Sequence, residues 1–227
     1  MLMSPMLAET VHSGRPLLGS YDVEEEVRMI PAGYGVKGMF FDRLVIVLGP
    51  EFEAAAKTLQ KPPANGRYVG FRDYPGGDFA RLAAACARKV YPRLGLREGV
   101  RRIALDDFKV FSDSVVGKVT LAVASDARSV LNKVPFIYRS LAPGDWDIAA
   151  ADVNDHIVRL DFRPFVGRWE YAIGQFEGAV LHYRPRSVIQ VYELENGHVR
   201  FDVEHDPVEE SRGSSLRPSA ESSSGRS

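Results

Sequence analysis

A change of hydrophobic period at Pro143-Gly144 constrains the fold more than any other feature of this chain. Before it, apolar residues recur at helical spacing, as Val100, Ala104 and Phe108 do. After it, apolar and polar residues alternate, which is typical of strands that face a core on one side. Helices followed by strands predict an α+β domain, with an N-terminal helical part packed on a C-terminal antiparallel sheet.

Five segments before the change carry the helical period: residues 36–48, 51–59, 78–90, 97–124 and 126–141. Gly49-Pro50 ends the first of them. Asp78 and Asp126 occupy positions where an aspartate caps a helix N-terminus. Pro135 is expected to kink the last helix.

Two hairpins and one helix are expected after the change of period. Asn154-Asp155 and Asn196-Gly197 are dipeptides that favour tight hairpin turns. The stripe from Trp169 to Val180 predicts a helix that crosses the sheet. The expected strands are residues 146–153, 156–163, 187–194 and 198–204. The C-terminal part therefore has the order ββαββ.

Both ends of the chain differ in composition from its middle. Residues 1–24 mix Pro, Gly and Ser with little periodicity, and we expect them to be loosely ordered. Residues 206–227 are rich in Ser, Glu and Arg and are expected to form a disordered tail. A single α+β domain is expected over residues 25–205, which is long enough to bury a core.

The composition argues against several classes of function. A net charge of −1 gives no field that would draw the protein to nucleic acid. No apolar run approaches the roughly 20 residues of a membrane-spanning helix, and Pro5 and Glu9 interrupt the only candidate for a leader. Cys86 is the single cysteine, which excludes an internal disulfide and a cysteine-rich metal site. We expect a cytoplasmic protein with no nucleic-acid or membrane partner.

A series of short motifs in a fixed order carries a family resemblance. The motifs are Val36-Lys37-Gly38-Met39-Phe40-Phe41, Tyr74-Pro75, Tyr91-Pro92, Gly99 to Ala104, Phe111 with Gly117-Lys118, Leu131 to Pro135 with Tyr138-Arg139-Ser140, and Phe176-Glu177-Gly178. With them the chain resembles a family restricted to myxobacteria, which occurs as many paralogues of uncharacterised function. The resemblance covers about Val27 to His205.

The layout of helices, a late kinked helix and a crossed sheet is also similar to haem-nitric-oxide-binding (H-NOX) domains and 4-vinyl reductase domains. That resemblance implies a small ligand enclosed between helices and sheet. In H-NOX domains a histidine on the late helix holds the haem iron, and a Tyr-x-Ser-x-Arg motif grips the propionates. The comparable helix here has Tyr138 but no histidine, and no Tyr-x-Ser-x-Arg follows. No haem or other cofactor is therefore expected, and the lone Cys86 does not match the zinc-type cluster of some 4-vinyl reductases.

Other residues that could carry chemistry have simpler explanations. Tyrosine can ligate haem iron, and Arg139 would lower the pKa of Tyr138, but core packing is the preferred interpretation. Asp106 and Asp107 with Asp113 could be taken for an acid pair or a metal site, but a solvated helix face is the preferred interpretation. The five histidines lack the spacing of helical metal ligands: His12, His156, His182, His198 and His205. No nucleophile, base and orienting group come together, so we expect no enzyme.

Gly117 is the least easily explained residue of the predicted helix over residues 97–124. A glycine inside a helix costs about 1 kcal/mol relative to alanine, so the tertiary structure is expected to require it. Either another helix approaches closely, or a ligand takes the space beside it. In the second case aromatic residues would line an apolar pocket with Gly117: Phe108, Phe111, Phe136, Tyr138, Trp146, Trp169 and Phe176. The same residues would also suit an ordinary core.

The resulting hypothesis is a non-enzymatic sensory or regulatory domain. It would bind a small apolar ligand, or a partner protein, between helices and sheet. The alternative is a dimeric protein–protein interaction module with a closed core and no ligand, in which the helix over residues 36–48 forms the contact surface. Because a fold does not determine a function, the resemblance supports the first hypothesis only by analogy.

Overall fold

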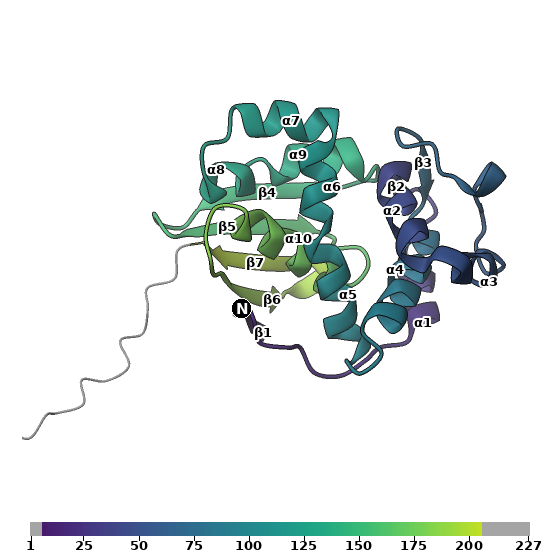
Figure 1. The fold of residues 1–227 in the computed structure, drawn as a ribbon. Helices are drawn as coiled ribbons and strands as arrows, with labels where there is room; N and C mark the ends of the chain where they lie inside the picture. Colours follow the sequence, from purple (N-terminus) through teal and green to yellow (C-terminus); the bar gives the residue numbers. More distant parts are fainter. Residues whose placement is uncertain (1–5, 206–227) are drawn as a thin grey trace, which may run out of the picture.

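Helices occupy the first half of the chain and an antiparallel sheet most of the second, which confirms the α+β class (Figure 1). The structure, a computed structural model, describes residues 6–205. The predicted tail over residues 206–227 lies outside this range. In the part of the chain that the structure describes, no helix is long and apolar enough to cross a membrane.

Five strands form the main sheet in the order β1-β6-β7-β5-β4, and every neighbouring pair is antiparallel. Their bounds are β1 Met6–His12, β4 Asp147–Asp152, β5 Ile157–Arg163, β6 Val188–Glu193 and β7 Val199–Glu204. Both predicted hairpins are present as β4–β5 and β6–β7. In the second turn Asn196 and Gly197 have φ of 59° and 70°, the backbone that this turn dipeptide favours.

Strand β1 belongs to the segment that was expected to be loosely ordered, and for residues 6–12 that prediction is wrong. Val11 lies opposite Ile189 of β6, and its side chain is only 3% exposed. The segment that follows β1 is held to helix α5 (Leu96–Leu105), because the backbone N–H of Leu17 donates to Glu98 Oε2 at 2.9 Å. These partners are distant in sequence, so the local pattern contains little sign of the strand.

The helices differ from the predicted ones mainly in where they bend. Their bounds are α1 Val23–Met29, α2 Gly38–Leu48, α3 Phe52–Ala56, α4 Gly76–Val90, α5 Leu96–Leu105, α6 Asp107–Asp113, α7 Val115–Ala122, α8 Ala127–Leu131, α9 Val134–Leu141 and α10 Trp169–Leu181. Short strands β2 (Gly35–Lys37) and β3 (Asp73–Pro75) pair before α2 and α4. Three-residue 3₁₀ turns occupy residues 49–51, 64–66 and 195–197.

The predicted helix over residues 97–124 is three helices, α5, α6 and α7. Ser114 has extended backbone (φ −74°, ψ 162°), and its hydroxyl accepts from the N–H of Gly117 at 3.0 Å, so it ends α6 and caps α7.

The predicted helix over residues 126–141 is also divided, into α8 and α9. Asp126 caps α8 as expected, whereas Pro135 lies in the first turn of α9 and does not kink a longer helix. The prediction that Asp78 caps a helix is wrong. Asp78 lies inside α4, and its carboxylate accepts from the loop N–H groups of Gln60 and Lys61, both at 2.8 Å.

Close packing of the backbone explains why residue 117 has to be a glycine. A Cβ added there would lie 1.8 Å from the carbonyl oxygen of Phe111, so no larger residue fits where the chain turns back from α6 into α7. The neighbour is the end of the preceding helix. The space beside Gly117 is therefore filled by backbone and leaves no room for a ligand.

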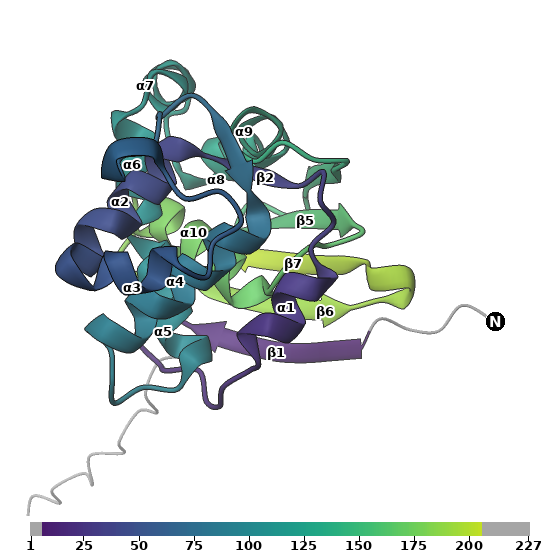
Figure 2. The same cartoon turned by 90° about the vertical axis from the view of Figure 1, so that its right-hand side faces the viewer.

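Two glycines of α10 allow the helices to pack closely on the sheet side of the protein. This helix crosses the inner face of the sheet, and α5 packs against both α10 and α4 (Figure 1). A Cβ added at Gly174 would lie 2.2 Å from the carbonyl oxygen of Arg101, and one at Gly178 would lie 2.5 Å from that of Leu105. The glycines thus allow α5 to contact α10 backbone to backbone. Helices α1 to α4 form the layer that faces the viewer in Figure 2.

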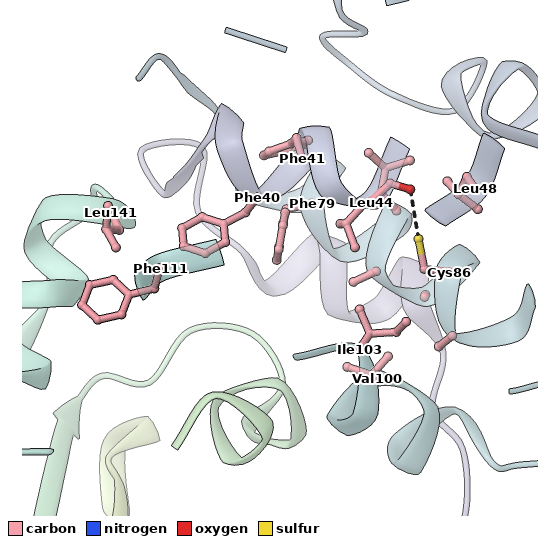
Figure 3. Packing of buried hydrophobic residues seen from close by; sticks show 14 of the residues in the cluster. Phe40, Phe41, Leu44, Leu48, Phe79, Cys86, Val100, Ile103, Phe111 and Leu141 are labelled. Carbon is pink, nitrogen blue, oxygen red and sulfur yellow. Dashed lines mark hydrogen bonds between the residues drawn. The ribbon is translucent and has the colours of Figure 1, made fainter. Parts of the chain in front are cut away.

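Two groups of buried apolar side chains form the core. Alternate residues of the sheet, such as Leu160, Phe162 and Phe201, pack on Ile173 and Phe176 of α10. The second group joins α2, α4 and α5 (Figure 3). It includes the apolar face of α2, which would be a dimer contact under the alternative hypothesis but is buried in the protein itself. Ile46 alone of the large apolar residues of α2 is strongly exposed, at 77%.

Candidate ligand-binding site

A cavity of about 190 Å³ lies where the helical layer meets α9 and α10. Its walls come from α2, α4 and α6 on one side and from α9 and α10 on the other, and α1 and the loop before α10 close one end. Figure 3 shows Phe40, Phe111 and Leu141, from α2, α6 and α9, gathered near one another, and all three line the cavity. The lining is mostly apolar, because the apolar faces of several helices converge on the same place.

The structure brings together five of the eight residues predicted for the pocket: Phe108, Phe111, Tyr138, Trp146 and Phe176 line the cavity. The other three lie elsewhere. Phe136 is on the outer face of α9 and is 57% exposed. Trp169 donates from Nε1 to Glu193 Oε1 at 3.2 Å, and Gly117 packs on the end of α6. That any of these residues binds a ligand stays a prediction.

Asp107 forms the centre of a polar network in the cavity wall. It is buried, which corrects its prediction as part of a solvated face. Arg43 of α2 forms a salt bridge with it, the hydroxyl of Tyr171 donates to it, and Gln175 Nε2 lies 3.5 Å from Oδ2. Burial raises the pKa of Asp107 to about 6, although the charge of Arg43 and these hydrogen bonds oppose the rise. The network links α2, α6 and α10.

Tyr138 extends this network to α9. Its hydroxyl donates to Gln175 Oε1 at 2.8 Å. Burial raises the pKa of Tyr138, and the nearby charge of Asp107 raises it further, so the prediction that Arg139 would lower it is wrong. Burial also raises the pKa of Tyr171 well above its ordinary value. Both phenols therefore keep their protons at neutral pH.

Glu26 of α1 is a second buried carboxylate in the lining, 5% exposed, and the sequence reasoning missed it. Its Oε1 accepts from the backbone N–H of Arg168 at 3.1 Å, while Oε2 has no hydrogen-bond partner. Burial raises the pKa of Glu26 to about 7, against the opposing effects of Arg168 and Tyr21, and Glu170 raises it further. One sign was available in the sequence: Glu26 stands at helical spacing from Val23 and next to Val27, on the apolar face of this helix.

Haem, the cofactor that the resemblance implies, would need a side chain in the cavity lining that can bind its iron. Among the lining residues that the structure describes there is no histidine, cysteine or methionine. A tyrosine ligand would have to give up its proton, which burial of Tyr138 and Tyr171 opposes. Nor do three or more His, Cys, Asp or Glu side chains gather to hold a metal ion anywhere within residues 6–205. These donors do not fit haem, and its absence stays a prediction.

Solved structures with the same arrangement of helices and sheet are H-NOX proteins. An H-NOX protein from S. oneidensis in the Fe(II)NO ligation state has a TM-score of 0.56 and is 15% identical; the match covers 74% of this chain and 98% of that one. An Fe(II) unliganded H-NOX protein from K. algicida has a TM-score of 0.52 and is 16% identical, covering 74% of this chain and 95% of that one. At this level of identity the likeness shows an H-NOX-like fold and nothing about the ligand.

The sequence itself identifies a family. The chain belongs to the family described as protein of unknown function DUF2378, whose model matches residues 30–205. The match begins after α1, so Glu26 and strand β1 lie outside it. A search of curated proteins finds no significant match.

Proposed function

We propose that this protein is a non-enzymatic sensory domain that binds a small apolar ligand between its helices and its sheet, without haem. The observation that carries the proposal is the apolar cavity of about 190 Å³ at the junction of the layers. An engineered apolar cavity of about 150 Å³ is large enough to bind benzene. The typical pocket for a drug-sized ligand is larger, roughly 300–1,000 Å³. A molecule with one ring therefore suits this cavity better than a large cofactor does.

The position of the cavity supports a sensory role. A ligand there would contact α2, α6, α9 and α10 together, and these are the helices that the Asp107 network joins. A ligand shifts a conformational equilibrium when its affinity differs between two arrangements of such elements. The donor set of the lining supports a haem-free site. Restriction of the family to myxobacteria, a cytoplasmic location and a partner protein all stay predictions.

Titration of the full-length protein with toluene tests the proposal. Toluene should shift the amide NMR signals of α2, α6, α9 and α10 in a saturable way. Ala83→Leu fills part of the cavity and should weaken toluene binding at least tenfold, because Ala83 lines it. Ala85→Leu, on the same helix but outside the lining, should leave binding unchanged. Absence of saturable shifts, or equal binding by both variants, would contradict the proposal.

A second titration tests the haem-free part of the proposal separately. Adding haemin to the purified protein should give no Soret band beyond that of free haemin. A stoichiometric Soret band that Tyr138→Phe abolishes would show that the cavity holds haem through that phenol, and the haem-free proposal would then fail.

A further inference from the structure

The end of the cavity next to α1 contains buried polar atoms without partners. Neither Glu26 Oε2 nor Arg168 Nε has a hydrogen-bond partner. Of the cavity-lining residues that the structure describes, only these two have such an atom. Buried polar groups in folded proteins are almost always hydrogen-bonded, so an unpaired acceptor and an unpaired donor in one wall indicate a missing partner.

The two side chains come from different elements that the backbone holds together. Glu26 lies on α1, and Arg168 precedes α10; the N–H of Arg168 donates to Glu26 Oε1 at 3.1 Å. The guanidinium group of Arg168 lies over the ring of Tyr21, 4.7 Å from its centroid. These contacts fix the carboxylate and the guanidinium group in one wall of the cavity.

The other polar side chains in the lining already have partners, including Tyr21, whose hydroxyl group interacts with Glu26, so they offer less to a ligand. Asp107 is bound by Arg43 and Tyr171, as described above. Tyr138 donates to Gln175, and Tyr34 donates to the carbonyl oxygen of Asp145 at 2.9 Å. Polar recognition of a ligand is therefore expected at the Glu26 end, with apolar contact elsewhere.

We propose that the ligand is a small phenol or cyclic alcohol, whose hydroxyl group lies between Glu26 and Arg168 while its ring fills the apolar part of the cavity. This inference rests on the proposed function, since it names the chemical class of the same ligand. A hydroxyl group donates one hydrogen bond and accepts others, so it can pair with Glu26 Oε2 and with Arg168 Nε together.

Other chemical classes fit these two atoms less well. A hydrocarbon leaves both unpaired. A carboxylate ligand brings negative charge against Glu26 and Glu170, and an ammonium group has no acceptor for Arg168 Nε. Burial also raises the pKa of Glu26 to about 7, with Tyr21, Arg168 and Glu170 facing it. A hydroxyl group can pair with either form of that carboxyl group, because it both donates and accepts.

Phenol and toluene provide the test, because they differ only in a hydroxyl group that replaces a methyl group. Their dissociation constants are measured by NMR titration of the full-length protein and of two variants. Glu26→Leu should lower the preference for phenol over toluene at least tenfold, because it removes the acceptor. Glu25→Leu is the matched control, on the same helix but exposed, and should keep the wild-type preference.

The outcomes separate this inference from the proposed function. If toluene binds and the preference is the same in the wild type and in Glu26→Leu, the hydroxyl contact is wrong and the apolar site stands. If neither compound binds the wild type, both proposals fall. A crystal structure of the wild type with phenol settles the contact even if Glu26→Leu does not fold. The phenol oxygen is expected within hydrogen-bond distance of Glu26 Oε2, and a retained water there with the phenol elsewhere would overturn the inference.

Discussion

The role of a single residue in this protein depends on neighbours that are distant in sequence. Glu26 stands in a run of three glutamates, and Asp107 follows another aspartate, so both resemble solvated helix positions. The fold buries both in the wall of one cavity. Sequence reasoning could find the aromatic residues of the site, because they repeat with the helical period. For the carboxylates the sequence offers only the position of Glu26 on an apolar helical stripe, since their burial depends on Arg43 and Arg168, which come from other elements.

Glu26 should make the stability of the protein depend on pH. Its pKa is raised from 4.5 to about 7 in the folded state, where Tyr21, Arg168 and Glu170 face it. Between these values the folded protein holds a proton that the unfolded chain has lost, so stability should fall as pH rises through this window. Glu26→Gln cannot titrate there. Chemical denaturation should show the variant gaining on the wild type between pH 4.5 and 7, by on the order of 3 kcal/mol in total.

The matched control for this pH dependence is Glu25→Gln, which changes an exposed residue of the same helix. Its unfolding free energy should follow that of the wild type at every pH. A difference between Glu26→Gln and the wild type that stays constant with pH would show that Glu26 titrates alike in the folded and unfolded states.

Gly117 should not tolerate even a methyl group. A Cβ there would lie 1.8 Å from the carbonyl oxygen of Phe111, which is backbone and cannot move aside without opening the turn. Gly117→Ala should therefore lower the unfolding free energy by about 1–3 kcal/mol, the range for overpacking. At Gly33 a Cβ would meet nothing within 4 Å, so Gly33→Ala should be neutral or slightly stabilising. Equal effects of the two changes in thermal denaturation would refute this explanation of Gly117.

At the scale of elements, the pair of helices α5 and α10 joins the two halves of the protein. Close backbone contact and a buried ionic network hold them together. Arg101 Nη1 lies 2.5 Å from Glu177 Oε2, and Arg101 Nε lies 2.8 Å from Glu98 Oε2. The helical period of α5 to α7 was readable in the sequence. Their bends were not, because the residues at the bends, Asp106 and Ser114, are common on helix surfaces and end a helix only in their tertiary context.

Removing the positive charge of Arg101 from the buried ionic network should lower the unfolding free energy strongly. Arg101→Met leaves Glu98 and Glu177 buried, with a positive charge missing between them. Removing one partner of a buried ion pair typically costs about 3–5 kcal/mol of stability. Urea denaturation should show a loss of this size. Arg128→Met breaks an exposed pair with Asp152 and should have a much smaller effect, so similar losses in the two variants would argue against a special role of the network.

Strand β1 should contribute to stability although the N-terminal sequence gives little sign of it. Val11 faces the sheet core, whereas Ala8 of the same strand is exposed. Val11→Asp would bury an unpaired charge, which strongly disfavours the folded state. We expect a large drop in melting temperature for Val11→Asp and little change for Ala8→Asp. A melting temperature unaffected by Val11→Asp would mean that β1 is not part of the stable sheet.

At the scale of the whole molecule, the sequence predicted the α+β class, the two hairpins and the crossing helix, because each depends on local periodicity and turn residues. Strand β1 and the position of the cavity depend on how the layers meet, which local patterns do not record. The fold is similar to that of H-NOX proteins. The described lining of its cavity is apolar apart from a few polar side chains and offers no histidine.

The central claim is that this H-NOX-like fold has a cavity that admits a small apolar molecule. Crystals of the full-length protein pressurised with xenon test it most directly, since xenon occupies dry apolar cavities of this size. We predict a xenon peak between Phe40, Phe111 and Leu141, and its loss in Ala83→Leu. Side chains that close over this space in the crystal, with no xenon among them, would contradict the claim.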